Sequence, residues 1–139
     1  GYFIPSQVKA ARVGAFPNSI RDYLRLNNYG AALEIVDRWE DLFAAEKIKG
    51  QTFFWRGKIF SMRDQSKPAA EFLDLAISLA IGAEFENEAR WRLAIALEQM
   101  GKTRRSREEL TKLVKTGLND DWARLAREKL AKAAPEKPK

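Results

Sequence analysis

Residues of similar chemical character recur every 37 positions along this chain. Large apolar or aromatic residues stand at Tyr23, Phe60 and Leu97, and a residue type common in turns follows four positions after each of them. The columns that keep this spacing are Ile20, Gly57 and Ala94; Tyr23, Phe60 and Leu97; Asn27, Asp64 and Gly101; Ala32, Ala69 and Ser106; and Val36, Leu73 and Leu110. Five sets of positions that each recur three times at this spacing predict an internal repeat of three units.

Within each unit, apolar residues recur at intervals of three and four, which is the spacing of one face of a helix. The first such helix of the second unit carries Phe53, Gly57 and Phe60. A second helix is predicted to start after Asp64, with Ser66 as its N-cap and Pro68 in its first turn. The third unit repeats this pattern, with Gly101 ending one helix. Thr103 or Ser106 could begin the next, and Thr103 has the better capping geometry. The sequence therefore predicts an all-α domain of paired helices.

These units resemble the tetratricopeptide repeat, whose pattern combines W-x2-L-G-x2-Y with A-x3-F over about 34 residues. The matching residues are Phe16, Ile20 and Tyr23 with Ala32-x3-Val36; Phe53, Gly57 and Phe60 with Ala69-x3-Leu73; and Leu93-Ala94-x2-Leu97 with Ser106-x3-Leu110. Trp39 stands where the family usually has a small residue. The resemblance implies a right-handed superhelix, or α-solenoid, of about three helix-turn-helix repeats closed by a C-terminal capping helix.

The predicted domain boundaries follow the repeat. The repeat domain covers 16–133, with units at about 16–46, 50–82 and 84–117 and a capping helix at 119–133. Residues 1–15 form an extension whose structure the sequence leaves open, and 134–139 contain two Pro and are expected to be disordered. The chain begins with Gly1 instead of Met, so we expect a segment of a longer protein. Its localisation stays open, with the cytoplasm as the default and an extracytoplasmic compartment as the alternative.

Composition excludes several classes of function. The 139 residues contain no Cys and no His, which removes disulfides, the usual zinc ligands and every nucleophile pair that depends on His. No stretch approaches the roughly 20 apolar residues that a membrane-spanning helix needs. We predict a protein without enzymatic activity, with no catalytic residue, no metal site and no cofactor.

The net charge of +6 favours acidic partners in general. The densest basic cluster is Lys102, Arg104, Arg105 and Arg107. Because no aromatic residue is interleaved with this cluster, we interpret it as a solvated turn and helix start rather than a nucleic-acid platform.

In tetratricopeptide domains the first helix of each pair lines a concave groove that holds a peptide or a partner helix. Carried over by position, the predicted groove residues are Arg21, Arg25, Phe54, Trp55, Lys58, Trp91, Arg92 and Ile95. Exposed aromatic residues beside Lys and Arg are typical of a binding surface. The alternative, that Trp55 and Trp91 pack in the core or between repeats, stays open.

The resemblance implies a protein-interaction scaffold whose partner is another protein or peptide of acidic or mixed charge. The family's terminal-carboxylate clamp uses Asn and Lys, whereas the matching positions here carry Arg21, Lys58 and Ile95, so we do not expect that clamp. An assembly domain that packs on a larger protein or a second copy is one alternative. A basic helical repeat that binds nucleic acid is the other, and only the net charge favours it.

Overall fold

The computed structural model describes the backbone of residues 5–116 and 119–132. These residues form seven helices and no strand, so the all-α prediction is confirmed for the described part of the chain. The helices are α1 (Pro5–Arg25), α2 (Tyr29–Leu42), α3 (Glu46–Met62), α4 (Ser66–Ser78), α5 (Ala83–Gln99), α6 (Thr103–Lys115) and α7 (Asp121–Lys132).

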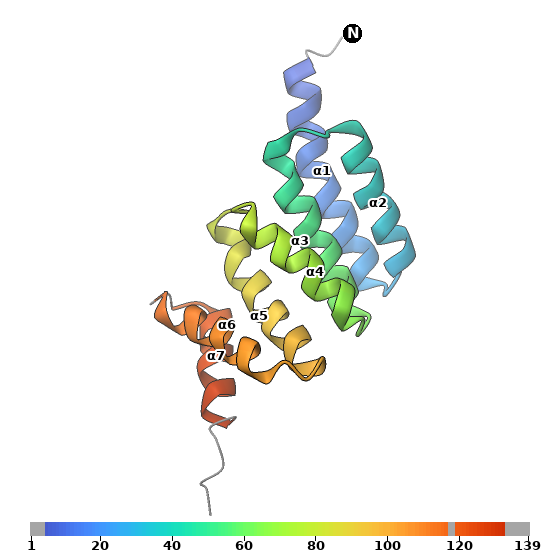
Figure 1. Cartoon of the computed structure of the whole chain (residues 1–139). Helices are drawn as coiled ribbons and strands as arrows, with labels where there is room; N and C mark the ends of the chain where they lie inside the picture. The colour runs from blue at the N-terminus through green and yellow to red at the C-terminus, as the bar shows by residue number, and fades with distance from the viewer. Residues whose placement is uncertain (1–4, 117–118, 133–139) are drawn as a thin grey trace, which may run out of the picture.

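The helices pack mainly on their neighbours in sequence, each one on the next from α1 to α7. Figure 1 shows this order as a progression along the molecule, with α1 and α7 at opposite ends. Two further contacts skip one helix and join α3 to α5 and α5 to α7. The helix α5 therefore lies beside α3 as well as α4, and α7 lies beside α5 as well as α6. None of the described helices combines the length and the apolar character that crossing a membrane requires.

The three turns inside the helix pairs have the same backbone geometry. Asn27, Asp64 and Gly101 adopt φ values of +56°, +58° and +79°, a left-handed conformation that Gly, Asn and Asp tolerate best. The amide that follows each of them donates to a carbonyl five residues earlier: Asn28 to Tyr23 at 2.9 Å, Gln65 to Phe60 at 3.0 Å and Lys102 to Leu97 at 2.8 Å. The predicted turn positions are confirmed.

The predicted N-caps Ser66 and Thr103 are wrong by one residue. Each is the first residue of its helix, and the cap positions belong to Gln65 and Lys102, which make no capping bond with their side chains. The cap residue directly follows the left-handed residue, so each turn is one residue shorter than a cap at Ser66 or Thr103 would require. The hydroxyl of Ser66 instead donates to Oε1 of Gln99 at 2.5 Å and joins α4 to α5.

The first helix starts before the predicted repeat domain. It starts at Pro5 and continues through Pro17 to Arg25, so most of the extension left open at 1–15 is helical. The helix α3 starts at Glu46, ahead of the predicted start of the second unit at 50. The predicted tail at 134–139 lies outside the described residues.

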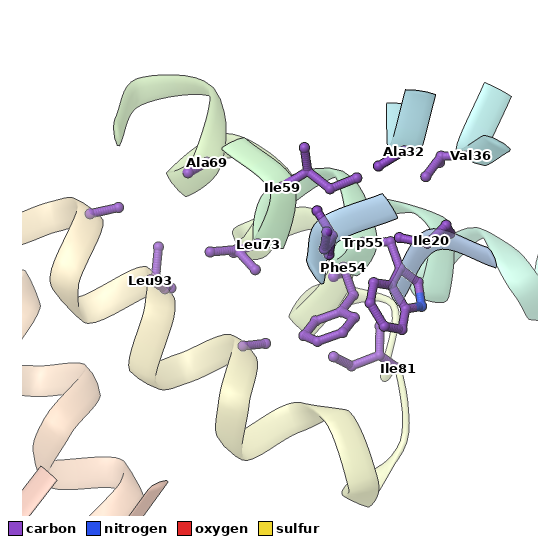
Figure 2. Packing of buried hydrophobic residues seen from close by; sticks show 14 of the residues in the cluster. Ile20, Ala32, Val36, Phe54, Trp55, Ile59, Ala69, Leu73, Ile81 and Leu93 are labelled. Carbon is purple, nitrogen blue, oxygen red and sulfur yellow. The ribbon is translucent and has the colours of Figure 1, made fainter. Parts of the chain in front are cut away.

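The buried apolar residues form two clusters that meet at α5. The main core draws on α1 to α5 and includes Ile20, Val36, Ile59, Leu73 and Leu93 (Figure 2). A smaller cluster joins α5 to α6 and α7 through Ala94, Leu110, Leu113 and Ala126. Because α7 adds only small buried side chains, Ala123 and Ala126, its position also depends on polar contacts.

One such contact fixes the start of α7. Nδ2 of the buried Asn87 on α5 donates to Oδ2 of Asp120 at 2.7 Å, and Oδ1 of Asp120 accepts from the Ala123 amide at 2.8 Å. The hydrogen bond from Asn87 lowers the pKa of Asp120 most, and the α7 amides and Arg127 add to it, which outweighs the opposite effect of burial. The carboxylate therefore prefers its ionised form in the folded chain.

Replacing Asn87 with Ala is expected to lower the free energy of unfolding more at pH 7 than near pH 3. A carboxyl whose folded-state pKa lies below its ordinary value of about 3.9 stabilises the fold above that value. This contribution is lost as the pH falls through the folded-state pKa. The variant moves the pKa of Asp120 back towards its ordinary value. At low pH Asp120 is increasingly protonated with or without Asn87, so the variant then loses mainly the packing of the Asn87 side chain. Urea unfolding at both pH values measures the difference.

The exposed Asn119 provides the matched control, since Asn119→Ala removes a neighbouring amide and should leave the pH dependence of stability unchanged. An Asn87→Ala variant that loses the same free energy at both pH values would contradict the assignment of the low pKa to this hydrogen bond.

Candidate functional site

Basic side chains from α1, α3 and α5 line one surface pocket of about 330 Å³. We call this the basic pocket, and its residues are Arg21, Leu24, Arg25, Lys58, Met62 and Arg92. The two α1 arginines lie one turn apart, so both reach the same side of that helix. Four of the eight residues predicted for the groove, Arg21, Arg25, Lys58 and Arg92, are therefore brought together by the fold.

The buried Trp55 lies beneath two of these cations. The guanidinium carbon of Arg21 lies 5.1 Å from the centroid of the Trp55 ring, and Nζ of Lys58 lies 5.0 Å from it. A cation over an indole face is attracted to its electron density. Because Trp55 is only 1% exposed, its ring has a fixed position and restricts where both cations lie. Nη1 of Arg21 also donates to Oδ1 of Asn18 at 3.3 Å.

Glu88 on α5 connects α5 to α3 at the pocket. Its Oε2 lies 3.0 Å from Nζ of Lys58 and accepts from Nε of Arg92 at 2.8 Å. Nη1 of Arg92 donates to the hydroxyl of Ser61 on α3 at 3.0 Å. Arg92 is therefore oriented from two sides, and α3 and α5 are joined at the wall of the pocket.

The basic pocket carries an excess of positive charge. Within the described residues, its four cations pair with two carboxylates: Asp22 pairs with Arg25, and Glu88 is shared by Lys58 and Arg92. Arg21 has no carboxylate partner there, and its contacts are Asn18 and Trp55. The cations exceed the carboxylates that pair with them by two charges, so the pocket attracts anions.

Trp91 and Ile95 lie in a second pocket that adjoins the first. This pocket of about 130 Å³ lies between α3 and α5, and it shares Arg92 with the basic pocket. Trp91 is half-buried and also packs against the smaller apolar cluster. Three of the predicted groove residues thus lie together here, with Ser61, Asp64 and Gln99 as polar neighbours.

Phe54 and Trp55 are both buried, so the expectation that Phe54 is exposed is wrong. Their exposed fractions are 0% and 1%, and both point into the core (Figure 2). Phe85 of α5 lies with its ring centroid 5.0 Å from that of Phe54. The helices α2, α4 and α5 all pack on α3, so most of its surface is covered and little of it faces solvent. Of the two interpretations left open for Trp55, the core interpretation holds.

Sequence reasoning missed Met62 in the basic pocket and Glu88 beside it. Both stand four residues from a predicted site residue, Met62 after Lys58 and Glu88 before Arg92. Residues at that spacing are neighbours on a helix surface. An i,i+4 search around the predicted cations would have found them.

Two other pockets occur on the described surface. The described residues that line a pocket of about 720 Å³ all belong to α6 and include Arg104, Arg107 and Lys115. An apolar pocket of about 270 Å³ lies between the end of α2 and the start of α3, beside Phe43 and Phe53. The basic pocket differs from the α6 pocket because three helices converge on it, and from the apolar pocket because its lining is basic.

Comparison with known proteins adds no further assignment. No family model matches the chain, and no curated protein matches it significantly. The candidate site therefore depends on its own geometry and charge.

Proposed function

We propose that this chain is a protein-interaction module of the tetratricopeptide kind that binds an acidic segment of a partner protein. The observation that carries the proposal is the convergence of four cations from three helices on one pocket. A segment lying across the first helices of successive pairs would contact all of them. Charge complementarity of this kind guides association and selects partners.

The equivalent turns support the repeat architecture. Three left-handed residues recur 37 positions apart, each with the same hydrogen bond behind it. The direct contact of α3 with α5 and of α5 with α7 is the arrangement that a stack of helix pairs requires. A surface built from these helices then runs from α3 to α7, and α1 adjoins it where Arg21 lies over the Trp55 ring.

The adjoining pocket supplies the apolar part of such a surface. Trp91 and Ile95 are partly exposed there, beside the charged Arg92. Aromatic residues and Arg contribute a large share of the binding energy in many interfaces. We therefore expect the partner segment to place acidic side chains over the basic pocket and an apolar side chain near Trp91.

Replacing Arg21 with Glu is expected to weaken binding of a short Glu-rich peptide on the order of tenfold or more. Arg21 is exposed and has no carboxylate partner among the described residues, so the change should leave the fold intact. Fluorescence anisotropy of the labelled peptide measures the affinity. The same peptide with Gln in place of Glu gives the contribution of charge, and circular dichroism checks the fold.

The matched control is Arg104→Glu, which changes the net charge equally at a side chain that is 93% exposed on α6. It should leave the affinity nearly unchanged. Equal weakening by both variants would mean that only the overall charge matters and would contradict a site at the basic pocket. Preferential binding of an oligonucleotide, or a dimeric mass in solution scattering with no peptide binding, would favour the nucleic-acid or assembly functions instead.

A further inference from the structure

We infer that the basic pocket is selective for a phosphate monoester, so that the preferred partner segment carries a phosphorylated side chain. This inference rests on the proposed function and adds to it the chemical group that is recognised. It depends on three properties of the pocket: the kind of cation, the way the cations are held, and the number of unbalanced charges.

Three of the four cations are arginines, and they come from α1 and α5 on either side of Lys58. A guanidinium presents its N–H donors in a planar fork that matches two oxygens of a phosphate at once. Within the described residues, Arg21 donates one hydrogen bond and Arg92 donates two. Each guanidinium carries five N–H donors, so both retain donors for an oxyanion.

The cationic groups are held in place before any ligand binds. Arg21 and Lys58 both lie over the buried ring of Trp55, and Glu88 holds Lys58 and Arg92. The fixed position of Trp55 and the low side-chain exposure of Glu88, 13%, restrict these contacts further. Cations that are already ordered lose less conformational freedom on binding, which favours a compact anion that several of them can contact together.

The charge balance favours a dianion. The cations of the pocket exceed their carboxylate partners by two charges, and a phosphate monoester carries between about −1.5 and −2 at pH 7. A single Asp or Glu side chain or a phosphodiester supplies one negative charge. The cations also converge on one pocket of about 330 Å³ instead of forming a line, which suits one strongly charged group better than the repeated phosphates of a nucleic acid.

The experiment compares one short peptide in three forms that differ only at the central residue, which is Ser, Glu or phosphoserine. We expect the phosphoserine form to bind the wild-type chain on the order of tenfold more tightly than the Glu form. Arg21→Lys keeps the charge and removes the fork, so it should reduce this ratio. Arg104→Lys is the matched control and should leave the ratio unchanged.

The pH dependence provides an independent readout. The second pKa of a phosphate monoester is about 6, and the chain contains no His, the side chain whose ordinary pKa falls in that range. Affinity for the phosphoserine peptide should therefore rise up to roughly tenfold between pH 5 and pH 7.5. Affinity for the Glu peptide should stay nearly constant.

Other outcomes separate this inference from the proposed function. Equal affinity for the Glu and phosphoserine peptides, with both dependent on Arg21, would overturn phosphate selectivity and leave the acidic-segment function standing. Tighter binding of a single-stranded oligonucleotide, or of vesicles bearing a phosphoinositide, would overturn the assignment to a phosphorylated protein. Failure of the Glu form, the phosphoserine form and the Glu-rich peptide to bind would overturn both proposals.

Discussion

Replacing Trp39 with Ala is expected to lower the free energy of unfolding by about 3–5 kcal/mol. The side chain is fully buried on α2, and its ring stacks on Phe16 of α1 with centroids 5.7 Å apart. Truncation removes apolar surface from the core and leaves a cavity between the two helices, which the surrounding side chains fill only in part. Urea unfolding followed by circular dichroism measures the loss.

Two further variants test the reason for this loss. Leu26 is 75% exposed, so Leu26→Ala should change the free energy of unfolding by less than about 0.5 kcal/mol. Trp39→Phe should cost much less than Trp39→Ala, because it keeps a ring in the core and removes a buried indole N–H that has no acceptor among the described residues. A loss below about 1 kcal/mol for Trp39→Ala would contradict its role as a core anchor.

Gly57→Ala is expected to destabilise the chain by about 1–2 kcal/mol, although Ala is the better helix former. A Cβ at Gly57 would lie 2.6 Å and 2.7 Å from Cγ and Cδ2 of Leu73 and 3.2 Å from its amide nitrogen. Leu73 is fully buried on α4, so it has no open space to move into. The helices α3 and α4 would have to separate at their crossing, and urea unfolding would report the cost.

Gly14→Ala supplies the matched control because the opposite sign is expected. Gly14 lies within α1, is exposed, and has no heavy atom within 4 Å of an added Cβ. Ala should therefore stabilise this helix by about 0.5–1 kcal/mol. If Gly57→Ala were also stabilising, the close approach of α3 and α4 would not limit the side chain at that position.

The positions of the turns could be predicted from the sequence because they depend on local chemistry. A residue in the left-handed conformation must tolerate positive φ. Asn27, Asp64 and Gly101 belong to the residue types that do so best. The period of 37 aligns Gly57 with Ile20 and Ala94, which differ in size, so only the structure shows that position 57 lies close against Leu73. The turns, in contrast, each depend on one residue type that recurs at a regular spacing.

The site was predicted only in part, since exposure depends on how many neighbours a helix has. The sequence placed Arg21, Lys58 and Arg92 on one predicted surface, and the structure brings the three together in one pocket. Phe54 and Trp55 were assigned to the same surface, but α5 covers Phe54 through Phe85. A helix packed by others on several sides buries apolar residues around most of its circumference, so a one-sided pattern does not apply to it.

The sequence by itself thus determined the helical class and the three equivalent turns, because helix propensity and φ tolerance act over a few residues. The tertiary structure alone decided which charges share a pocket and which aromatic rings lie beneath it. Glu88 pairs with Lys58 across 30 residues of sequence and joins it to Arg92, and Arg21 on α1 reaches Trp55 on α3. Contacts of this range depend on how helix pairs stack, which no local pattern specifies.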